Sequence, residues 1–198
     1  VFAYDAQIAA AGITTVFDSL RAGSDADRHS LGGGLHALGA AIERAKTTGL
    51  LRVDHHTHLR CEICAEDVLD ETRAYLDRFD VRLMSLMDHT PGQRQFRDEQ
   101  KLRDYYRGKS PGKSAEELKA FFDRRKILHR KLSEDHRRVL VDLAHACGIA
   151  LASHDDTTVG HVEESLADGV SVAEFPTTVE AARASHAAGL AVLMGAPN

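Results

Sequence analysis

The alternation of helix and strand signals along the whole chain constrains the fold more than any other feature. Six short apolar or β-branched runs are predicted as strands, and segments with helical spacing of apolar residues separate them. The predicted strands are residues 13–17, 50–61, 81–87, 149–153, 170–174 and 190–194; the predicted helices are residues 2–11, 35–47, 65–78, 97–107, 114–146, 158–168 and 178–188. Such alternation builds a parallel sheet from right-handed βαβ units. A doubly wound sheet and a (β/α)8 barrel both satisfy it, and no G-x-G-x-x-G or Walker A loop follows a strand.

Composition narrows the class of protein. A chain of 198 residues with 43% apolar and 28% charged residues is typical of one globular domain. The net charge of −5 argues against a nucleic-acid partner. No apolar run approaches the roughly 20 residues of a membrane span, and no signal-peptide pattern is present, so we expect no membrane partner. Three cysteines fit a reducing cytoplasm, and we expect a cytoplasmic protein.

Polar side chains gather where the predicted strands end. They are Asp18, Arg60, Glu62, Asp88, His89, His154, Asp155, Asp156, Glu174 and Asn198. Barrels and open α/β sheets place their active sites at the carboxyl ends of parallel strands. Six strands that end in this way predict a functional site at that edge of the sheet.

The richest of these strands is the segment V-D-H-H-T-H-L-R-C-E at residues 53–62. Because side chains alternate along a strand, His56, His58, Arg60 and Glu62 share one face. Imidazole and carboxylate groups bind divalent metals such as zinc or manganese, and a metal lowers the pKa of bound water. A nearby carboxylate could serve as a base, and arginine binds anionic oxygens.

Several of these polar residues also have structural interpretations. His55 and His56 face opposite ways, so at least one of them is expected to pack toward the helices, and His58 is open to either kind of role. Asp155 and Asp156 would also serve as caps of the following helix. Seven histidines on predicted helices or loops are interpreted as solvated or hydrogen-bonded: His29, His36, His129, His136, His145, His161 and His186.

Cys61 and Cys64 form a C-x-x-C pair at a strand-to-helix junction, the position of a thioredoxin-like motif. The pair contains no turn proline, and Glu62 lies inside it. A cysteine-based structural zinc site would need a second pair, and only Cys147 remains. We therefore expect neither a redox motif nor a zinc knuckle.

Five longer segments together resemble the phosphonate-metabolism protein M family of the amidohydrolase superfamily. They are H-x-x-H-L-R-C-E, S-L-M-D-H-T-P-G-Q-R-Q-F, A-S-H-D-D-T-T, A-E-F-P-T-T and V-L-M-G-A-P-N, in this order. The resemblance implies a (β/α)8 TIM-barrel fold with a divalent metal centre of one or two zinc or manganese ions. It also implies hydrolysis of ribose 1-methylphosphonate 5-triphosphate, a phosphorylated sugar, to the 5-phosphate and pyrophosphate.

The resemblance further implies roles for individual residues. Glu62, His89 and His154 are similar to metal ligands, with Glu62 as a bridging carboxylate and His58 as a further candidate ligand. The residues implied as partners of the triphosphate are Arg60, Gln93 and Arg94. Asp156 and Glu174 are implied to support the ligands or to transfer protons.

The chain departs from the family pattern in its number of strands. About six of eight βα units are counted, which we assign to strands two to seven of a barrel, and we expect residues 1–198 to form one partial metal-dependent hydrolase domain. An open barrel exposes two sheet edges, so we expect homo-oligomers that form through them. A non-catalytic remnant or assembly partner, and a deaminase or cyclic amidase, are the alternatives. The polar H-T-P-G-Q-R-Q-F loop favours an anionic substrate.

Overall fold

The computed structural model describes residues 1–24, 34–109 and 114–195. The strand-end residue Asn198, the loop histidine His29 and residues 110–112, between two of the predicted helices, lie outside these ranges. Within them, the chain alternates helices and strands as the sequence predicts.

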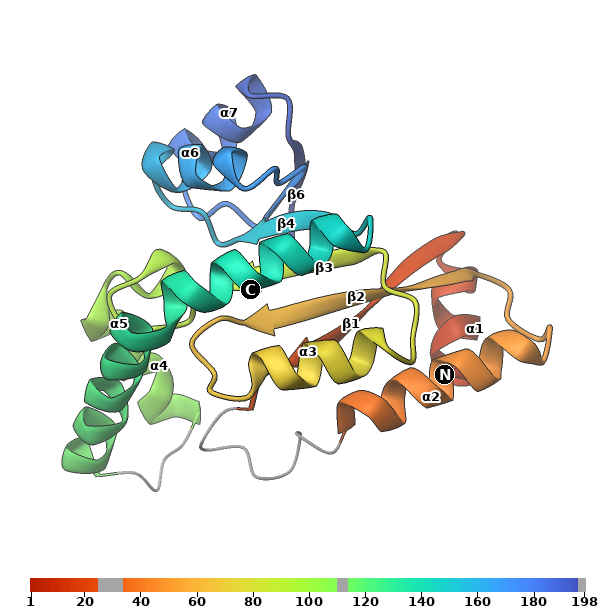
Figure 1. The fold of residues 1–198 in the computed structure, drawn as a ribbon, viewed down its shortest axis with the longest axis horizontal. Coiled ribbons are helices and arrows are strands. Elements are labelled where there is room, and N and C mark those ends of the chain that lie inside the picture. Colours follow the sequence, from red (N-terminus) through yellow and green to blue (C-terminus); the bar gives the residue numbers. More distant parts are fainter. Residues whose placement is uncertain (25–33, 110–113, 196–198) are drawn as a thin grey trace.

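Six parallel strands form one sheet whose spatial order follows the chain order (Figure 1). They are β1 (Thr15–Ala22), β2 (Asp54–Glu62), β3 (Leu83–Met87), β4 (Ala150–His154), β5 (Val172–Glu174) and β6 (Ala191–Leu193). A doubly wound sheet would reverse its strand order at a switch point, and this sheet does not. The sheet is a curled half-barrel that is compatible with a partial TIM-type barrel.

The helices agree with the predicted segments to within a few residues. They are α1 (Phe2–Ala10), α2 (Gly34–Thr47), α3 (Val68–Leu76), α4 (Glu99–Lys109), α5 (Ala115–Ala146), α6 (Val159–Ala167) and α7 (Val179–Ala187), with a short 3-10 helix η1 (Arg94–Phe96) that the sequence did not reveal. The turns that precede β5 and β6 use Gly169 and Gly189 at φ values of +74° and +84°. These are the left-handed positions that glycine adopts without strain.

The prediction that the first strand ends at Asp18 was wrong. β1 continues to Ala22, and Asp18 lies inside the strand. The polar–apolar alternation persists beyond Asp18, since Leu20 and Ala22 are buried in the core. The side chain of Asp18 binds His55 on that same face, with 2.7 Å between Oδ2 and Nδ1.

The main apolar core lies between the sheet and the helices α2, α3 and α5, which cross the same side of it (Figure 1). The strands contribute Leu20, Leu59, Cys61, Met84, Leu86 and Leu151, and the helices contribute Ile42, Val68, Tyr75, Leu140 and Ala144. Every second side chain of a strand points toward this core. The intervening side chains therefore lie on the opposite, concave face, where they are available for chemistry.

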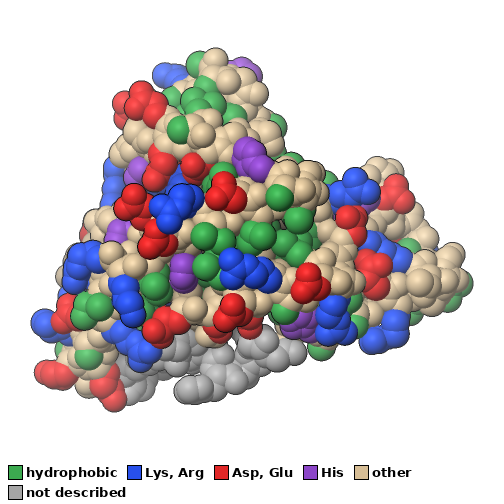
Figure 2. Space-filling view, viewed as in Figure 1, with side chains coloured by type: hydrophobic (Ala, Val, Ile, Leu, Met, Phe, Trp, Pro, Cys, Tyr) green, Lys and Arg blue, Asp and Glu red, His purple; other side chains and the backbone are tan. Residues whose placement is uncertain are grey.

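The long helix α5 begins with a capping box. The backbone N–H of Glu117 donates to Ser114 Oγ at 3.1 Å, and the N–H of Ser114 donates to Glu117 Oε2 at 2.7 Å. Positive and negative side chains are interspersed over the molecular face that contains α5 (Figure 2). In the described part of the chain, no helix is both long enough and apolar enough to cross a membrane.

Candidate metal centre

The concave face of the sheet brings polar side chains together at the carboxyl ends of the central strands. β2 supplies His58, Arg60 and Glu62, which alternate with the core residues Leu59 and Cys61. The neighbouring strands add a smaller set: His89 two residues after β3, His154 at the end of β4 and Glu174 at the end of β5. The parallel register pairs His154 directly with Glu174.

Glu62 is 1% exposed and holds His89 through two hydrogen bonds. Its Oε2 accepts from His89 Nδ1 at 2.6 Å, and its Oε1 accepts from the backbone N–H of His89 at 3.1 Å. Arg21 and Arg125 lie 3.1 and 3.4 Å from the same carboxylate. Burial alone would raise the pKa of Glu62, but the hydrogen bond from His89 and these positive charges hold it below its usual value. Because the ionised carboxylate accepts the Nδ1 proton, the Nε2 atom of His89 points away from Glu62.

His154 is held in the same way by Glu174. Its Nδ1 lies 2.7 Å from Glu174 Oε2, and its Nε2 accepts a hydrogen bond from Arg60 Nη2 at 3.2 Å. Burial opposes ionisation of Glu174, yet the hydrogen bond from His154 and the positive charge of Arg60 lower its pKa. In metal sites, a carboxylate at the far nitrogen of a histidine commonly fixes its tautomer in this manner.

The residues present fit a divalent cation. His89, His154 and Asp155 offer two ring nitrogens and one carboxylate oxygen that all lie within 4.8 Å of one another. Imidazole and carboxylate ligands suit zinc and related ions. Each histidine is also oriented by its own buried carboxylate, Glu62 or Glu174. The donor set therefore has both the ligands and the supporting hydrogen bonds that such a centre uses.

The sequence placed Asp155 among the strand-end residues of the predicted site and offered it as a helix cap, but it was not named as a metal ligand. The residue adopts a positive φ of +57°, and its backbone N–H donates to Glu174 O at 2.9 Å. This backbone geometry places Asp155 Oδ2 3.4 Å from His154 Nε2. Burial raises the pKa of Asp155 despite the nearby histidines His154 and His89. The H-D-D run places two carboxylates after β4, and only the backbone conformation shows which one joins the histidines.

The capping interpretation of Asp155 and Asp156 was wrong. Thr158 is the N-cap of α6, and its side chain accepts from the backbone N–H of His161 at 3.2 Å. Asp156 instead forms a buried ion pair with Arg94 and accepts from Ser165 Oγ at 3.3 Å.

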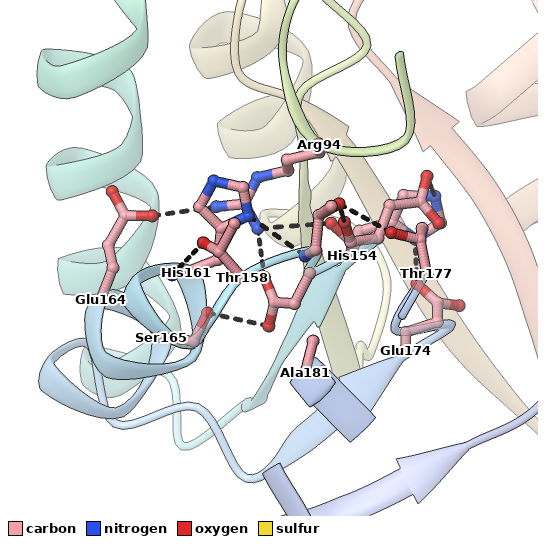
Figure 3. A network of polar contacts seen from close by, with 12 residues as sticks. Arg94, His154, Thr158, His161, Glu164, Ser165, Glu174, Thr177 and Ala181 are labelled. Carbon is pink, nitrogen blue, oxygen red and sulfur yellow. Dashed lines mark hydrogen bonds and ion pairs between the residues drawn. The ribbon is translucent and has the colours of Figure 1, made fainter. Parts of the chain in front are cut away.

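Arg94 has several partners in addition to Asp156 (Figure 3). Its Nη2 donates to Glu164 Oε2 at 2.9 Å, and its Nη1 lies 3.4 Å from the backbone oxygen of His154. Arg94 is buried and has a positive φ of +43°. Its positive charge is thus paired with two carboxylates of the protein. Arg94 connects the loop after β3 to β4 and α6. Gln93 is half-buried beside it, at the start of η1.

His58 lies deeper along β2 than the other histidines of the centre. Its Nδ1 is 3.1 Å from Ser19 Oγ and its Nε2 is 2.8 Å from Ser85 Oγ, so both ring nitrogens are hydrogen-bonded. Glu174 Oε1 is 3.9 Å from Nδ1. Burial lowers the pKa of His58 from 6.5 to about 4, and the ring is neutral at physiological pH. In this arrangement His58 packs between hydroxyl groups beneath the centre.

The remaining sequence candidates lie apart from the centre. His55 is buried on the helix side between Asp18 and Asp5, as expected for one histidine of the pair. His56 lies against the ring of Phe17, with 5.5 Å between ring centroids. The C-x-x-C cysteines have different neighbours, since Cys61 contacts Thr72 on the core side while Cys64 contacts the residues that follow β3.

Comparison with known proteins gives one informative match. No protein-family model matches the chain, and no solved structure matches it. The chain is 43% identical over 195 residues to the alpha-D-ribose 1-methylphosphonate 5-triphosphate diphosphatase of Escherichia coli (strain K12). The aligned region covers 98% of this chain and 51% of that enzyme, so the chain spans about half the length of its curated relative. The resemblance predicted from the five segments is therefore confirmed: over nearly its whole length, this chain is similar to a diphosphatase of that name.

Proposed function

We propose that this chain provides the metal-binding and triphosphate-binding rim of a hydrolase of phosphonate metabolism. The proposed substrate is ribose 1-methylphosphonate 5-triphosphate, which would be cleaved to the 5-phosphate and pyrophosphate. The name of the 43% identical relative supports the reaction class. The structural observation that carries the proposal is the group of His89, His154 and Asp155, whose ligand atoms lie within 4.8 Å of one another.

We assign the metal to these three residues. When bound, one or two zinc or manganese ions would supply Lewis acidity toward water and phosphoryl oxygens. Glu62 lies on the far side of His89 from this group, so its contacts support a role in orienting His89. Glu174 has the corresponding relationship to His154, and it keeps a proton at His154 Nδ1.

The arginines differ in what they can contribute. Arg60 donates to His154 Nε2, the lone pair that a metal would need. Arg60 would therefore turn aside when a metal binds, which frees its guanidinium for the anionic oxygens of a triphosphate. Arg94 is held by Asp156 and Glu164. We propose that the Arg94–Asp156 pair fixes the loop that presents Gln93, and that Asp156 acts through this pair.

The decisive experiment loads the chain with zinc or manganese, adds the ribose triphosphate and measures released pyrophosphate. We expect release by the loaded chain and its loss in His154→Ala. His186→Ala is the matched control, because His186 is an exposed histidine in the last turn of α7. Stoichiometric metal without pyrophosphate release would contradict catalysis by this chain and favour a non-catalytic, metal-binding function.

A second candidate function, assembly through the sheet edges, is favoured by the edge strands β1 and β6. Phe17 on β1 is 44% exposed, and Met194 directly after β6 is 70% exposed. Apolar side chains beside unpaired strand edges promote association with another chain. We propose that a second copy of the chain covers these edges.

A further inference from the structure

A second group of metal-ligating side chains lies outside the centre described above. Cys64 follows β2, Asp88 follows β3, and His129 lies within α5. Their sulfur, oxygen and nitrogen atoms all lie within 4.8 Å of one another. The Cys64 Sγ is 3.3 Å from Asp88 Oδ1 and 3.8 Å from His129 Nδ1, and Asp88 Oδ2 is 2.9 Å from His129 Nδ1.

We propose that Cys64, Asp88 and His129 form a second metal site that binds zinc or a similarly thiophilic divalent cation. A thiolate, an imidazole and a carboxylate suit zinc, whereas calcium and magnesium prefer all-oxygen ligands. Zinc bonds of about 2.0–2.3 Å in a tetrahedron place ligand atoms roughly 3.3–3.7 Å apart. The separations of 3.3 Å from Cys64 Sγ to Asp88 Oδ1 and 3.8 Å from Cys64 Sγ to His129 Nδ1 are close to that spacing. The other oxygen of Asp88 is 2.9 Å from His129 Nδ1, so the carboxylate and the imidazole would separate slightly to admit the ion.

Burial at this position also favours a specific site. Cys64 and Asp88 are 4% and 7% exposed, and Asp88 pairs with His129 and accepts from the N–H of Thr90, so the three potential ligands form one compact, largely buried cluster. A cavity of about 180 Å³ is lined by Cys64, Glu62 and Arg125 among others, so one of the three proposed ligands borders open space. The thiol proton that now lies between Cys64 and Asp88 would be released to solvent on binding.

The second site is separate from the first. Asp88 and His89 are consecutive residues after β3, but their side chains bind different partners. The His89 side chain binds Glu62, whereas the Asp88 side chain binds His129 and receives the N–H of Thr90. The proposal therefore does not rest on the function proposed above.

The position of His129 suggests what the second ion would do. Arg125 lies one helical turn earlier on α5 and is 3.4 Å from Glu62, so the two residues project from the same side of the helix. An ion that binds His129 to Cys64 and Asp88 would clamp α5 onto the strand ends. It would thereby hold Arg125 against Glu62. We assign the site a positioning role of this kind.

The experiment uses Co²⁺ as the probe on the full chain, because cobalt bound by a thiolate absorbs in the near ultraviolet through charge transfer. We expect this band in the unaltered chain and its loss in Cys64→Ser. Cys147→Ser is the matched control, since Cys147 is an exposed cysteine at the end of α5 and its variant should keep the band. His154→Ala should also keep the band, although that variant removes a proposed ligand of the first centre.

A second variant protects the test against a folding defect in Cys64→Ser. His129→Gln alters a partly exposed side chain. It should weaken zinc binding by more than about 100-fold, because loss of even an outer partner of a ligand costs about 10- to 100-fold. A thiolate band that survives Cys64→Ser, unaltered zinc affinity in His129→Gln, or metal binding without any thiolate band would each overturn the second site.

Discussion

Glu62 accepts hydrogen bonds from both the ring Nδ1 and the backbone N–H of His89, so one buried carboxylate fixes both the orientation and the tautomer of that imidazole. Two arginines share the same carboxylate, Arg21 from β1 and Arg125 from α5. Three elements of the fold thus converge on Glu62. We therefore expect its negative charge to stabilise the fold.

Glu62→Gln is expected to lower the free energy of unfolding by about 3 kcal/mol, since removal of one partner leaves buried positive charges uncompensated. Urea denaturation, monitored by circular dichroism, measures this change in the free energy of unfolding. The control is Glu66→Gln, because Glu66 forms an exposed ion pair with Arg124 at 3.7 Å. Exposed pairs contribute at most about 1 kcal/mol. Equal losses of unfolding free energy in the two variants would show that the burial of Glu62 does not account for its effect on stability.

Glu174→Gln is expected to weaken zinc binding by about 10- to 100-fold, because Glu174 orients His154 through its Nδ1. Isothermal titration of the metal-free chain gives the dissociation constant. Glu180→Gln changes an exposed glutamate in the first turn of α7 and should leave zinc binding unaltered. Wild-type affinity in Glu174→Gln would show that His154 does not need this partner.

His58 makes the stability depend on pH. Its pKa is lowered by burial to about 4 in the folded chain and is near 6.5 when unfolded, so the unfolded state binds more protons as the pH falls. Stability from this group is therefore lost between about pH 6.5 and 4, by an amount on the order of 3 kcal/mol. Denaturation curves at several pH values should show a smaller acid loss for His58→Gln than for the unaltered chain. His186→Gln changes an exposed histidine and should lose as much stability at acid pH as the unaltered chain. Identical pH profiles for all three proteins would contradict the prediction.

Gly23 follows β1 at a φ of +93°, and a Cβ there would lie 2.8 Å from Ala65 Cβ and 3.2 Å from Glu62 Cβ. Gly12 has a similar φ of +82° with nothing within 4 Å of its would-be Cβ. Gly12→Ala should therefore report the backbone cost alone, about 1–2 kcal/mol. Gly23→Ala should lower the free energy of unfolding by more than this, because Ala65 or Glu62 must also move. Thermal unfolding of both variants tests the difference, and a Gly23→Ala loss no larger than that of Gly12→Ala would refute it.

The proposed self-association is tested by size-exclusion chromatography with light scattering. We expect a dimer or larger species, and we expect Phe17→Lys to shift it toward monomer, because a charge on an edge strand opposes pairing. Ile127→Lys places the same charge at an exposed apolar residue of α5. That control should leave the oligomer unchanged. A stable, compact monomer of the unaltered chain would exclude association through the edges.

The face of the sheet on which each strand side chain lies could be predicted from sequence, because the alternation of side chains along a strand is a local property. Residues 53–62 placed Leu59 and Cys61 on one face and His58, Arg60 and Glu62 on the other, and the structure confirms that division. The strand order could also be predicted from sequence, since consecutive right-handed βαβ units place successive strands side by side.

The pairings between distant side chains could not be predicted in this way. The positive φ of Asp155 decides that it, and not Asp156, joins the histidines, and backbone conformation at a strand end has no simple sequence signature. Arg94 reaches Asp156 over an interval of 62 residues. Cys64 meets His129 over an interval of 65, so a motif search confined to cysteine spacing misses the pair.

The strand order has a consequence for how such a centre could be divided between polypeptides. His89, His154 and Asp155, with their supporting carboxylates, belong to the central strands β2 to β5 and their immediate ends. An added strand at β1 or β6 would leave the registers among those central strands unaltered. We therefore expect fragment complementation to succeed when a partner polypeptide docks at either edge, and to fail when the chain is split between β2 and β5.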